Sequence, residues 1–281
     1  MRRIVLACGG LALLGVALAL FLGNPSSWFH GFGVDKVTRS SQDITERVAR
    51  VDLDVPTGDV QLHGTNDGKT RIVRELRYWG DKPSDQTYRL AGDALRLGGC
   101  GDNCTVNYRV YLPRGLPVGG RLGSGNMLAN AVGDVRLDNS SGDMRFTDVK
   151  SAQLTVGSGN VTVTKDAGAA NVRSSSGEVE LRDIGGRADV HAGSGNVTAR
   201  GMHGPVKVGN SSGEVAVQSV AVSNVDVDTG SGNVNIRVPN APYQVHTEDN
   251  DRTRVDVPNT ASAPNSITVR SGSGDVSVAK S

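Results

Sequence analysis

One short turn recurs through this chain at a nearly constant interval, and this repeat limits the fold more than any other feature. The turn reads Gly-Ser-Gly-Asn or Ser-Ser-Gly-Asp/Glu, and the first seven copies are 17 to 19 residues apart. A period of this size is typical of proteins in which one small unit stacks on the next. The glycine after the serine falls at Gly125, Gly142, Gly159, Gly177, Gly195, Gly213, Gly232 and Gly274.

Apolar residues occupy fixed positions around each turn glycine, five and seven residues before it and two and four residues after it. Polar residues mostly fill the places between, and such alternation indicates strands with one buried face. Each unit is therefore predicted to hold two short strands joined by the turn. The predicted apolar columns contain Leu137, Leu154, Val172, Val190, Val208 and Val227 before the turns, and Val161, Val163, Val179, Leu181, Val215 and Val217 after them.

Strands this short cannot bury their apolar faces alone, so the pattern predicts that successive units stack as coils. Equivalent residues of neighbouring coils would lie about 4.8 Å apart, and each fully buried valine or leucine would contribute roughly 1.5–3 kcal/mol. We therefore predict an all-β fold, a parallel β-helix or β-solenoid with coils of about 18 residues. The alternative is an antiparallel sandwich with a hairpin at each turn, but near-identical consecutive units favour stacking.

The residue that follows each turn glycine alternates between asparagine and an acidic residue from Asn126 to Asn233. Stacked like charges would repel by about 1 kcal/mol even in water, and the intervening asparagines double the distance between carboxylates. A cation-binding edge is one interpretation of this row. The other is turn chemistry, because Asn and Asp favour such turns and Gly adopts positive φ. We favour turn chemistry and predict no metal site.

The repeat also extends toward the amino terminus. Gly58, in Pro-Thr-Gly-Asp-Val, has apolar residues at the same offsets as the other turn glycines. A first coil is therefore predicted over about 51–63, and the segment 64–118 becomes an insertion or an irregular cap.

At the other end, an interval of 42 residues separates the last two turn glycines and predicts one degenerate coil between them. Val255 and Val257 have suitable positions around a turn near Thr253, after a longer loop over 239–251. The coil near 276–279 would then end the stack without a cap, so end-to-end pairing of two chains is a further hypothesis.

The amino terminus has the composition of a membrane segment. Residues 4–22 carry no charge and follow two arginines, which suits either a signal peptide or a single span. A cleavage site is present near Ala19, but the apolar run continues past it, which favours an uncleaved anchor. The predicted organisation is a signal anchor or signal peptide over 1–23, a polar linker over 24–47 and an extracytoplasmic repeat domain over 48–281.

Two cysteines outside the apolar segment, Cys100 and Cys104, lie in the predicted insertion. In an exported chain, such a pair favours a short-range disulfide. Free thiols are one alternative, and a metal site is another, although it would need two further ligands and no histidine lies nearby in the sequence. We predict the disulfide.

The sequence contains no HExxH or phosphate-loop motif. Its histidines do not pair at metal-ligand spacing, and His191 takes an outward strand position. A net charge of +1 without clustered Lys and Arg argues against nucleic-acid binding. Enzymes built on β-helices need a local cluster of polar and aromatic residues, whereas polar residues here spread over all coils. We therefore predict no enzymatic activity.

These features, taken in order, resemble the bacterial toastrack domain, a β-strand-repeat family also named putative adhesin. The resemblance covers roughly residues 48–281 and rests on Pro-Thr-Gly-Asp-Val-Gln-Leu, on Tyr78-Trp79 with the Cys-x-x-x-Cys insertion, on Tyr111-Leu-Pro-Arg-Gly, and on the serial Ser-Gly-Asn/Asp/Glu-Val units. It implies a right-handed β-helix on the cell envelope, often tethered by one membrane helix. Some members are associated with envelope-stress systems, and the family has no catalytic residues to transfer.

We therefore expect a non-enzymatic, membrane-tethered, extracytoplasmic scaffold or adhesin-like interaction module. Its expected partners are the membrane, through residues 4–22, and an envelope protein or a cell-wall polymer, with no nucleic acid and no cofactor. Binding by a repeated surface would be multivalent and weak for each coil. An accessory or sensor role in an envelope-stress response is one alternative, and a carbohydrate-active β-helix enzyme is another.

Overall fold

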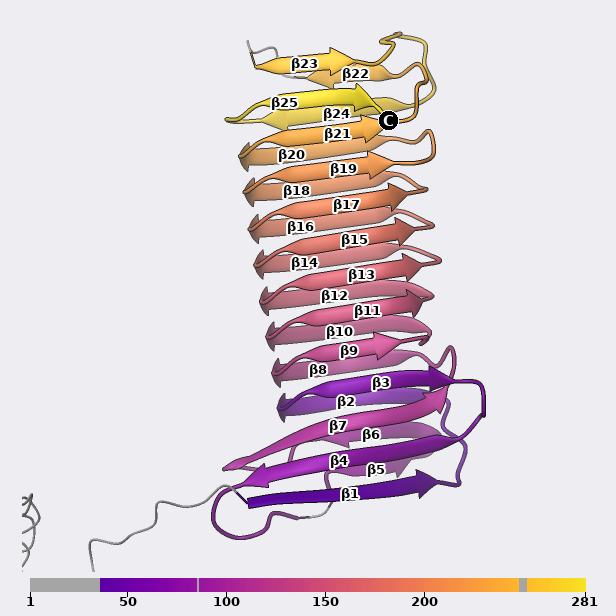
Figure 1. Cartoon of the computed structure of the whole chain (residues 1–281), viewed down its shortest axis with the longest axis vertical. Coiled ribbons are helices and arrows are strands. Elements are labelled where there is room, and N and C mark those ends of the chain that lie inside the picture. The colour runs from indigo at the N-terminus through magenta and orange to yellow at the C-terminus, as the bar shows by residue number, and fades with distance from the viewer. Residues whose placement is uncertain (1–35, 85, 248–251) are drawn as a thin grey trace, which may run out of the picture. The chain divides into compact units, whose positions relative to one another are not determined.

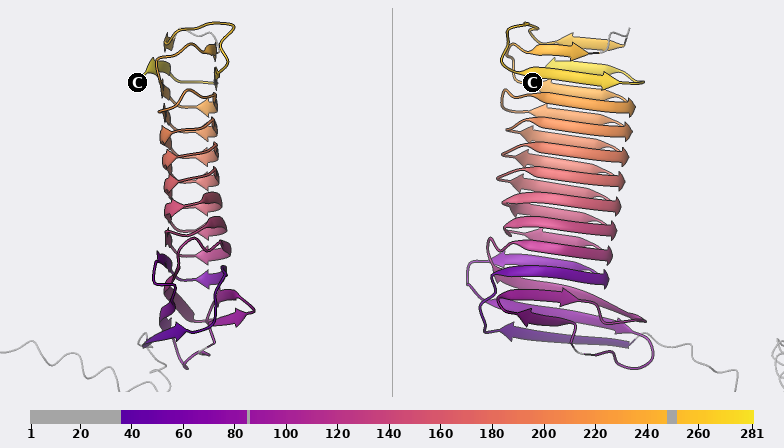
Figure 2. Two further views of the ribbon diagram at one scale, coloured as in Figure 1. Left: turned by 90° about the vertical axis from the view of Figure 1, so that its right-hand side faces the viewer. Right: turned by 180° about the vertical axis from the view of Figure 1, so that it is seen from behind.

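The computed structural model describes residues 36–84, 86–247 and 252–281, and its regular elements in these ranges are all β-strands (Figure 1). The strands belong to two sheets that pack face to face around one apolar core (Figure 2). In the part of the chain that the structure describes, no helix is long and apolar enough to span a bilayer. The predicted signal anchor over 1–23 lies outside the described residues.

In both sheets the order of the strands in space differs from their order in the chain, and it runs as follows. The 13-stranded sheet contains β1 (Lys36–Ile44), β4 (Thr70–Tyr78), β7 (Cys104–Pro113), β3 (Val60–Thr65), β9 (Met127–Asn130), β11 (Met144–Val149), β13 (Val161–Asp166), β15 (Val179–Ile184), β17 (Val197–Met202), β19 (Val215–Ser219), β21 (Val234–Val238), β25 (Val276–Lys280) and β23 (Thr253–Asp256). The 12-stranded sheet contains β22 (Gln244–Thr247), β24 (Ser266–Ser271), β20 (Val225–Ser231), β18 (Val206–Ser212), β16 (Ala188–Ser194), β14 (Ala170–Ser176), β12 (Ser151–Ser158), β10 (Asp134–Ser141), β8 (Val118–Ser124), β2 (Arg50–Thr57), β6 (Ala94–Gly98) and β5 (Tyr88–Ala91).

From β8 to β21 the chain alternates between the two sheets, so that each pair of consecutive strands forms one coil (Figure 1). Each strand runs parallel to the equivalent strand of the next coil. The register keeps equivalent residues side by side, since Leu137 pairs with Leu154 and Leu154 pairs with Val172. Parallel pairing of consecutive copies is that of a β-solenoid and excludes the antiparallel sandwich.

The predicted apolar columns lie between the two sheets. Burial of each such side chain contributes roughly 1.5–3 kcal/mol, so repeated columns can hold the coils together with few aromatic residues. The following residues each expose 2% of their surface or less: Leu137, Leu154, Val172, Val190, Val208, Val227, Val161, Val163, Val179, Leu181, Val215 and Val217.

The turn glycines stack at one corner of the coils, and the backbone there requires glycine. A Cβ on Gly142 would lie 2.2 Å from the carbonyl oxygen of Gly125 in the preceding coil, and the next turns repeat this contact. The φ angle is also positive, a region that L side chains rarely adopt. It lies between 114° and 146° at Gly58, Gly125, Gly142, Gly159, Gly177, Gly195, Gly213, Gly232 and Gly274.

The opposite corner contains a second series of left-handed residues, six positions after successive turn glycines. These residues are Ala131, Asp148, Lys165 and Asp183, with φ between 55° and 58°, followed by Gly201 at 71°. The backbone therefore bends in the same way at each of these corners, although the side chains differ. Non-glycine residues pay an energetic cost for this conformation.

A cap covers the end of the stack that lies beside the first coil, β2 and β3. In the cap, β7 runs parallel to β3, and β4 and β1 continue the sheet in antiparallel order. On the other sheet, β6 pairs with β2 and β5 pairs with β6. The segment 64–118, predicted as an insertion or cap, thus supplies the cap strands β4, β5, β6 and β7.

The prediction of a polar linker over 24–47 is wrong for Lys36–Ile44, which forms β1. This strand shows no apolar alternation because it lies at the sheet edge with all of its side chains exposed or half-buried. Ladder pairing with β4 holds it, together with ion pairs from Arg39 to Glu75 at 2.7 Å and from Arg71 to Asp43 at 2.6 Å.

The other end of the stack is not built in sequence order. β24 and β25 pair with β20 and β21, and β22 and β23 pair with the outer side of β24 and β25. The final coil therefore lies between the preceding coil and the degenerate one. This corrects two predictions: the degenerate coil over 244–256 is terminal in space rather than internal, and β25 is covered rather than open.

Candidate functional site

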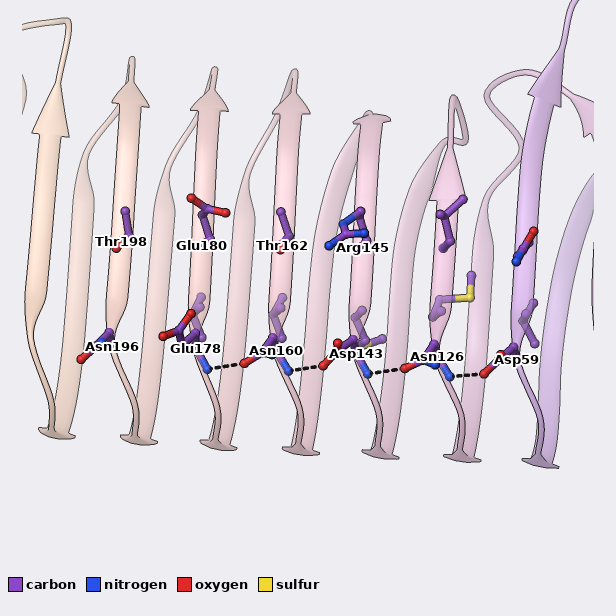
Figure 3. A pocket seen from close by; sticks show the side chains of 17 residues that line it. Asp59, Asn126, Asp143, Arg145, Asn160, Thr162, Glu178, Glu180, Asn196 and Thr198 are labelled. Atoms are coloured by element: carbon purple, nitrogen blue, oxygen red, sulfur yellow. Dashed lines mark hydrogen bonds between the residues drawn. The ribbon is translucent and has the colours of Figure 1, made fainter.

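A shallow groove follows the turn edge of the 13-stranded sheet across six coils, and we call it the turn-edge groove (Figure 3). Its volume is about 630 Å³. The residue after each turn glycine forms one wall, and the next outward residue of each strand forms the floor. Its polar lining residues are Asp59, Gln61, Asn126, Asp143, Arg145, Asn160, Thr162, Glu178, Glu180, Asn196 and Thr198.

Hydrogen bonds join the residues of this wall from coil to coil. Each short side chain accepts a hydrogen bond from the backbone N–H of the equivalent residue in the next coil. Asn126 Oδ1 accepts from Asp143 N at 2.9 Å, and Asp143 Oδ1 accepts from Asn160 N at 2.9 Å (Figure 3). These bonds satisfy turn N–H groups that the sheet ladders leave free, so the row acts as an inter-coil staple.

The structure shows that this alternating row is longer than the repeat in the sequence indicates. At the cap end, Asn107 of β7 accepts from Asp59 N at 2.9 Å, although no turn glycine precedes Asn107. At the other end, Asp275 N donates to Asn233 Oδ1 at 3.0 Å. In spatial order the row reads Asn107, Asp59, Asn126, Asp143, Asn160, Glu178, Asn196, Glu214, Asn233 and Asp275.

The two glutamates interrupt the staple. Glu178 N and Glu214 N donate to Asn160 and Asn196, each at 3.0 Å. Within the described residues, however, neither glutamate side chain accepts from the next coil, whereas the aspartates and asparagines before them do. The extra methylene moves the carboxylate away from the neighbouring N–H, so the side-chain length decides whether the bond forms.

Carboxylates on the wall of the groove remain without cationic partners. Within the described residues, Asp59, Asp143 and Glu178 form no ion pair, whereas Glu180 on the floor pairs with Arg182. No group of three or more His, Cys, Asp or Glu residues in the described chain is arranged to hold a metal ion. The alternation leaves each carboxylate beside neutral amides.

The cap contains the predicted disulfide. Cys100 and Cys104 are bonded, with their Cα atoms 5.6 Å apart. The loop that they close is held against β4, because Trp79 N donates to Asn103 O at 3.0 Å. Trp79 itself is 58% exposed beside this loop.

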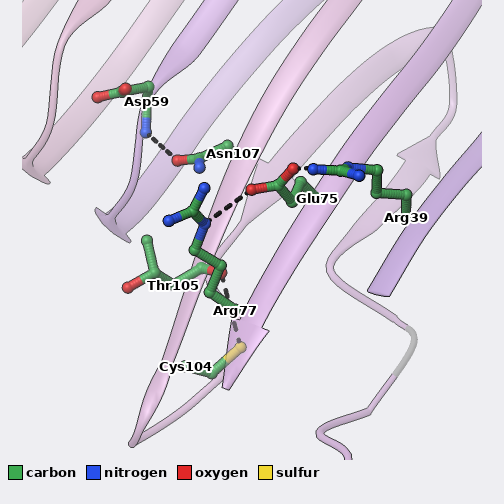
Figure 4. A network of polar contacts seen from close by, with 7 residues as sticks. All are labelled: Arg39, Asp59, Glu75, Arg77, Cys104, Thr105 and Asn107. Atoms are coloured by element: carbon green, nitrogen blue, oxygen red, sulfur yellow. Dashed lines mark hydrogen bonds and ion pairs between the residues drawn. The ribbon is translucent and has the colours of Figure 1, made fainter. Parts of the chain in front are cut away.

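A polar network lies on the cap next to the groove (Figure 4). Arg39 and Arg77 both bind Glu75, each at 2.7 Å, and together they hold the pKa of this carboxyl below its usual range. The network ties β1 to β4. Asp59 and Asn107 lie close to it, which places the first rung of the staple beside the cap (Figure 4).

The interior of the cap contains a buried tyrosine. The Tyr108 hydroxyl lies 2.6 Å from the carbonyl oxygen of Thr87 and 2.8 Å from that of Gly98. Burial raises the pKa of Tyr108 to about 12. Because the hydroxyl stays protonated, it can donate to these carbonyls and join the two sheets of the cap.

One carboxyl is buried among the coils. Asp166 is 1% exposed, and its Oδ1 accepts from Gly168 N at 2.9 Å. Among the residues that the structure describes, its Oδ2 has no hydrogen-bond partner. Burial raises the pKa of Asp166 above its usual value. The residue pairs in register with Val149 and Ile184, so it lies between two apolar residues in its column.

Comparison with known proteins identifies one family. A family model described as Toastrack DUF4097 matches residues 106–279, more than half of the chain. No curated protein matches. A solved structure described as a putative adhesin from Parabacteroides distasonis is 13% identical with a TM-score of 0.52, over 89% of this chain and 98% of that one. At this identity the match shows a shared fold.

Two further solved structures are similar over comparable lengths. A putative adhesin from Parabacteroides merdae is 12% identical, with a TM-score of 0.39 over 88% of this chain and 97% of that one. A putative cell adhesion protein from Clostridium sporogenes is also 12% identical, with a TM-score of 0.29 over 88% of this chain and 100% of that one.

Proposed function

We propose that this chain, which belongs to the Toastrack DUF4097 family, is a non-enzymatic interaction module of the cell envelope. The observation that supports this function is a surface that repeats from coil to coil, with no one coil set apart by a distinct cluster of catalytic or binding residues among the described residues. Two long faces present polar side chains at regular coil spacing, and the apolar residues that build the stack point between the sheets. A surface of this kind suits a multivalent partner whose contacts are individually weak.

We propose that residues 4–22 anchor the module in the membrane and that the coils lie outside the cytoplasm. The uncharged segment behind two arginines and the disulfide between Cys100 and Cys104 both support an exported chain. An envelope protein or a cell-wall polymer is then the partner class that the faces would meet.

An accessory or sensor role in an envelope-stress response is the second candidate. In this role, a signal from the coils would have to cross the bilayer through residues 4–22 or through a membrane partner. Deletion of residues 1–23 separates the two functions. A sensor loses its response without the segment, whereas a binding module keeps its affinity for the same partner.

Capture of partners from envelope fractions tests the proposal. The full-length protein is crosslinked in intact cells and recovered with whatever it has bound. A variant with Val190→Asp, which disrupts the stack, is the matched control for non-specific capture. We expect species that the intact protein recovers and the control does not; recovery of nothing, or equal recovery by both, contradicts the proposal. Depolymerisation of a polysaccharide by the purified protein would instead favour an enzyme.

A further inference from the structure

The outer face of the 12-stranded sheet contains a second hollow, lined by residues from β12 to β24. This sheet faces the viewer in the right-hand view of Figure 2. The volume of the hollow is about 810 Å³, which lies within the range of known ligand sites. Its floor includes Gly193, Gly209 and Gly230 on three consecutive strands. The glycines add no side chain of their own at these positions, so a flat ligand could approach the backbone closely.

At two of these positions, contacts with the neighbouring strand require glycine, and at the third no such contact exists among the described residues. A Cβ on Gly193 would lie 2.5 Å from Ser175 O, and one on Gly230 would lie 2.7 Å from Ser211 O. At Gly209 the nearest atom would be His191 Cδ2, at an ordinary contact distance of 3.4 Å, and φ lies outside the positive region. Glycine within a strand weakens it and often marks a place where a ligand comes close.

The polar groups around Gly209 include both donors and acceptors. In the register, His191 and Asp228 flank Gly209 on the two neighbouring strands. Lys207 and Ser211 lie two residues before and after it on the same face. Within the described residues, neither Lys207 nor Asp228 has an ion-pair or hydrogen-bond partner. A ligand that fits these groups must carry donors and acceptors on several sides.

This chemistry favours a hydroxyl-rich, uncharged ligand. Each hydroxyl offers one donor and two acceptor positions, so it can meet Asp228, Lys207 and Ser211 alike. The lining carries both signs of charge, with Arg173, Lys207 and Arg270 against Asp226 and Asp228. Asp226 already pairs with Arg270 at 3.5 Å, so neither a polyanion nor a polycation meets a surface of purely opposite charge. The hollow extends over several coils without end walls formed by other elements, which suits a polymer better than a single small molecule.

We propose that the hollow around Gly209 binds hexose units of a neutral envelope polysaccharide. A sugar ring would lie on the bare backbone at Gly209, against the imidazole of His191, with its hydroxyls bound by Asp228, Lys207 and Ser211. The inference rests on the proposed function, because it names the partner class for one face of the interaction module. It assigns no chemistry to the sugar beyond binding.

One substitution tests the site with little risk to the fold. Gly209→Thr fills the hollow with a residue that strands favour, and its Cβ has room beside His191. Gly119→Thr is the matched control, because Gly119 is also a strand glycine on the same sheet, its added Cβ would meet Arg136 O at 3.6 Å, and it lies outside the hollow. The probes are chitohexaose, cellohexaose and maltohexaose, titrated into the full-length protein and followed by calorimetry and by amide resonances.

We expect at least one of these oligosaccharides to bind and to shift the amide resonances of Gly209 and Ser211. Gly209→Thr should weaken that binding by about tenfold or more, and Gly119→Thr should leave it within about twofold. Equal binding by Gly209→Thr and the unchanged protein would overturn the site. Absence of binding by all three probes at about 10 mM, well above typical weak affinities, or preference for hexagalacturonate or for an oligolysine peptide, would overturn the ligand class.

Envelope capture separates this inference from the proposed function. If Gly209→Thr recovers the same partners as the unchanged protein, the hollow is not the binding surface, although the interaction module remains. If the unchanged protein recovers nothing, both fail.

Discussion

At the level of single residues, the two corners of each coil make different demands on the backbone. The turn corner permits only glycine. Along the regular coils, an added Cβ would lie within 2.3 Å of the carbonyl oxygen of the turn glycine in the preceding coil. The opposite corner also adopts positive φ but accepts alanine, aspartate and lysine. At this opposite corner, an L residue raises the energy of the folded state because its backbone is left-handed. Replacement of that residue by glycine can therefore remove this cost.

Lys165→Gly is expected to stabilise the protein by about 0.5–1 kcal/mol. The substitution removes the energetic cost of a left-handed L residue, and the greater conformational entropy of glycine in the unfolded chain offsets part of this gain. Lys165 is exposed, so little packing is lost. The matched control is Thr164→Gly, at a neighbouring strand position without positive φ, which should destabilise by about 1 kcal/mol. Urea unfolding measures both, and destabilisation by Lys165→Gly would contradict this account of the corner.

Asp166 should make stability depend on pH. Its pKa is raised in the folded state by burial, so its contribution is complete below the pKa of the unfolded chain and is lost as pH rises through the folded value. Asp166→Asn keeps an acceptor for Gly168 N and removes the charge. We expect the variant to be more stable than the unchanged protein at pH 7, with the difference shrinking toward pH 4. Parallel unfolding curves at all pH values would show that Asp166 is not the titrating group.

At the level of elements, the strands and turns of the regular coils could be predicted from the sequence, because each apolar residue has an equivalent in the next copy. The cap could not be predicted in detail. β1 is polar on nearly all of its positions, and β7 enters the staple through Asn107 without a turn glycine. Both depend on pairing with strands far away in the sequence, and no local pattern reports such pairing.

The wall of the turn-edge groove was visible in the sequence as an alternation, but the hydrogen bond that explains it was not. The bond predicts that Glu178→Asn extends the staple, because a shorter side chain can accept from Asn196 N. We expect a gain of about 0.5–1.5 kcal/mol. Glu178→Gln removes the same charge but keeps the longer side chain, so it should give no gain. Equal stabilisation by both would mean that charge rather than the hydrogen bond is responsible.

Two substitutions to aspartate test which side chains of the strands point into the core and which point outward. Val190→Asp places a charge between Val172 and Val208 in the core and should cost more than about 4 kcal/mol or prevent folding. Thr198→Asp places the same charge on the groove side of β17 and should cost less than about 1 kcal/mol. Thermal unfolding by circular dichroism distinguishes them, and similar losses would contradict the assignment of the two faces.

At the scale of the whole molecule, the family resemblance is confirmed by the match over 106–279, but the order of the last coils was predicted wrongly. The spacing of apolar residues around a turn is the same whether a coil lies within the stack or at its end. Spacing alone therefore cannot predict the position of a coil along the stack. One signal was present: Asp275 follows a Gly-Ser-Gly turn that elsewhere precedes asparagine. Its neighbour in space is Asn233, so alternation along the stack prevails over the local turn pattern.

The degenerate coil should act as the cap of this end. Replacing residues 241–263 by a connection of five residues, the length of the shorter loops between coils, would leave β24 and β25 as open edges. We expect the variant to associate end to end, because exposed parallel edges template pairing. Light scattering should give a mass that rises with concentration more steeply than for the unchanged chain. An unchanged mass would show that the covering strands are dispensable.

The interleaved order of the last two coils also has a consequence for synthesis. Most coils can pair with the preceding coil as soon as they leave the ribosome. By contrast, β22 and β23 pair with β24 and β25, which are synthesised after them. During synthesis, β22 and β23 therefore stay unpaired until β24 and β25 have been made. A product that stops short of β24 leaves β22 and β23 unpaired and the edges of β20 and β21 exposed.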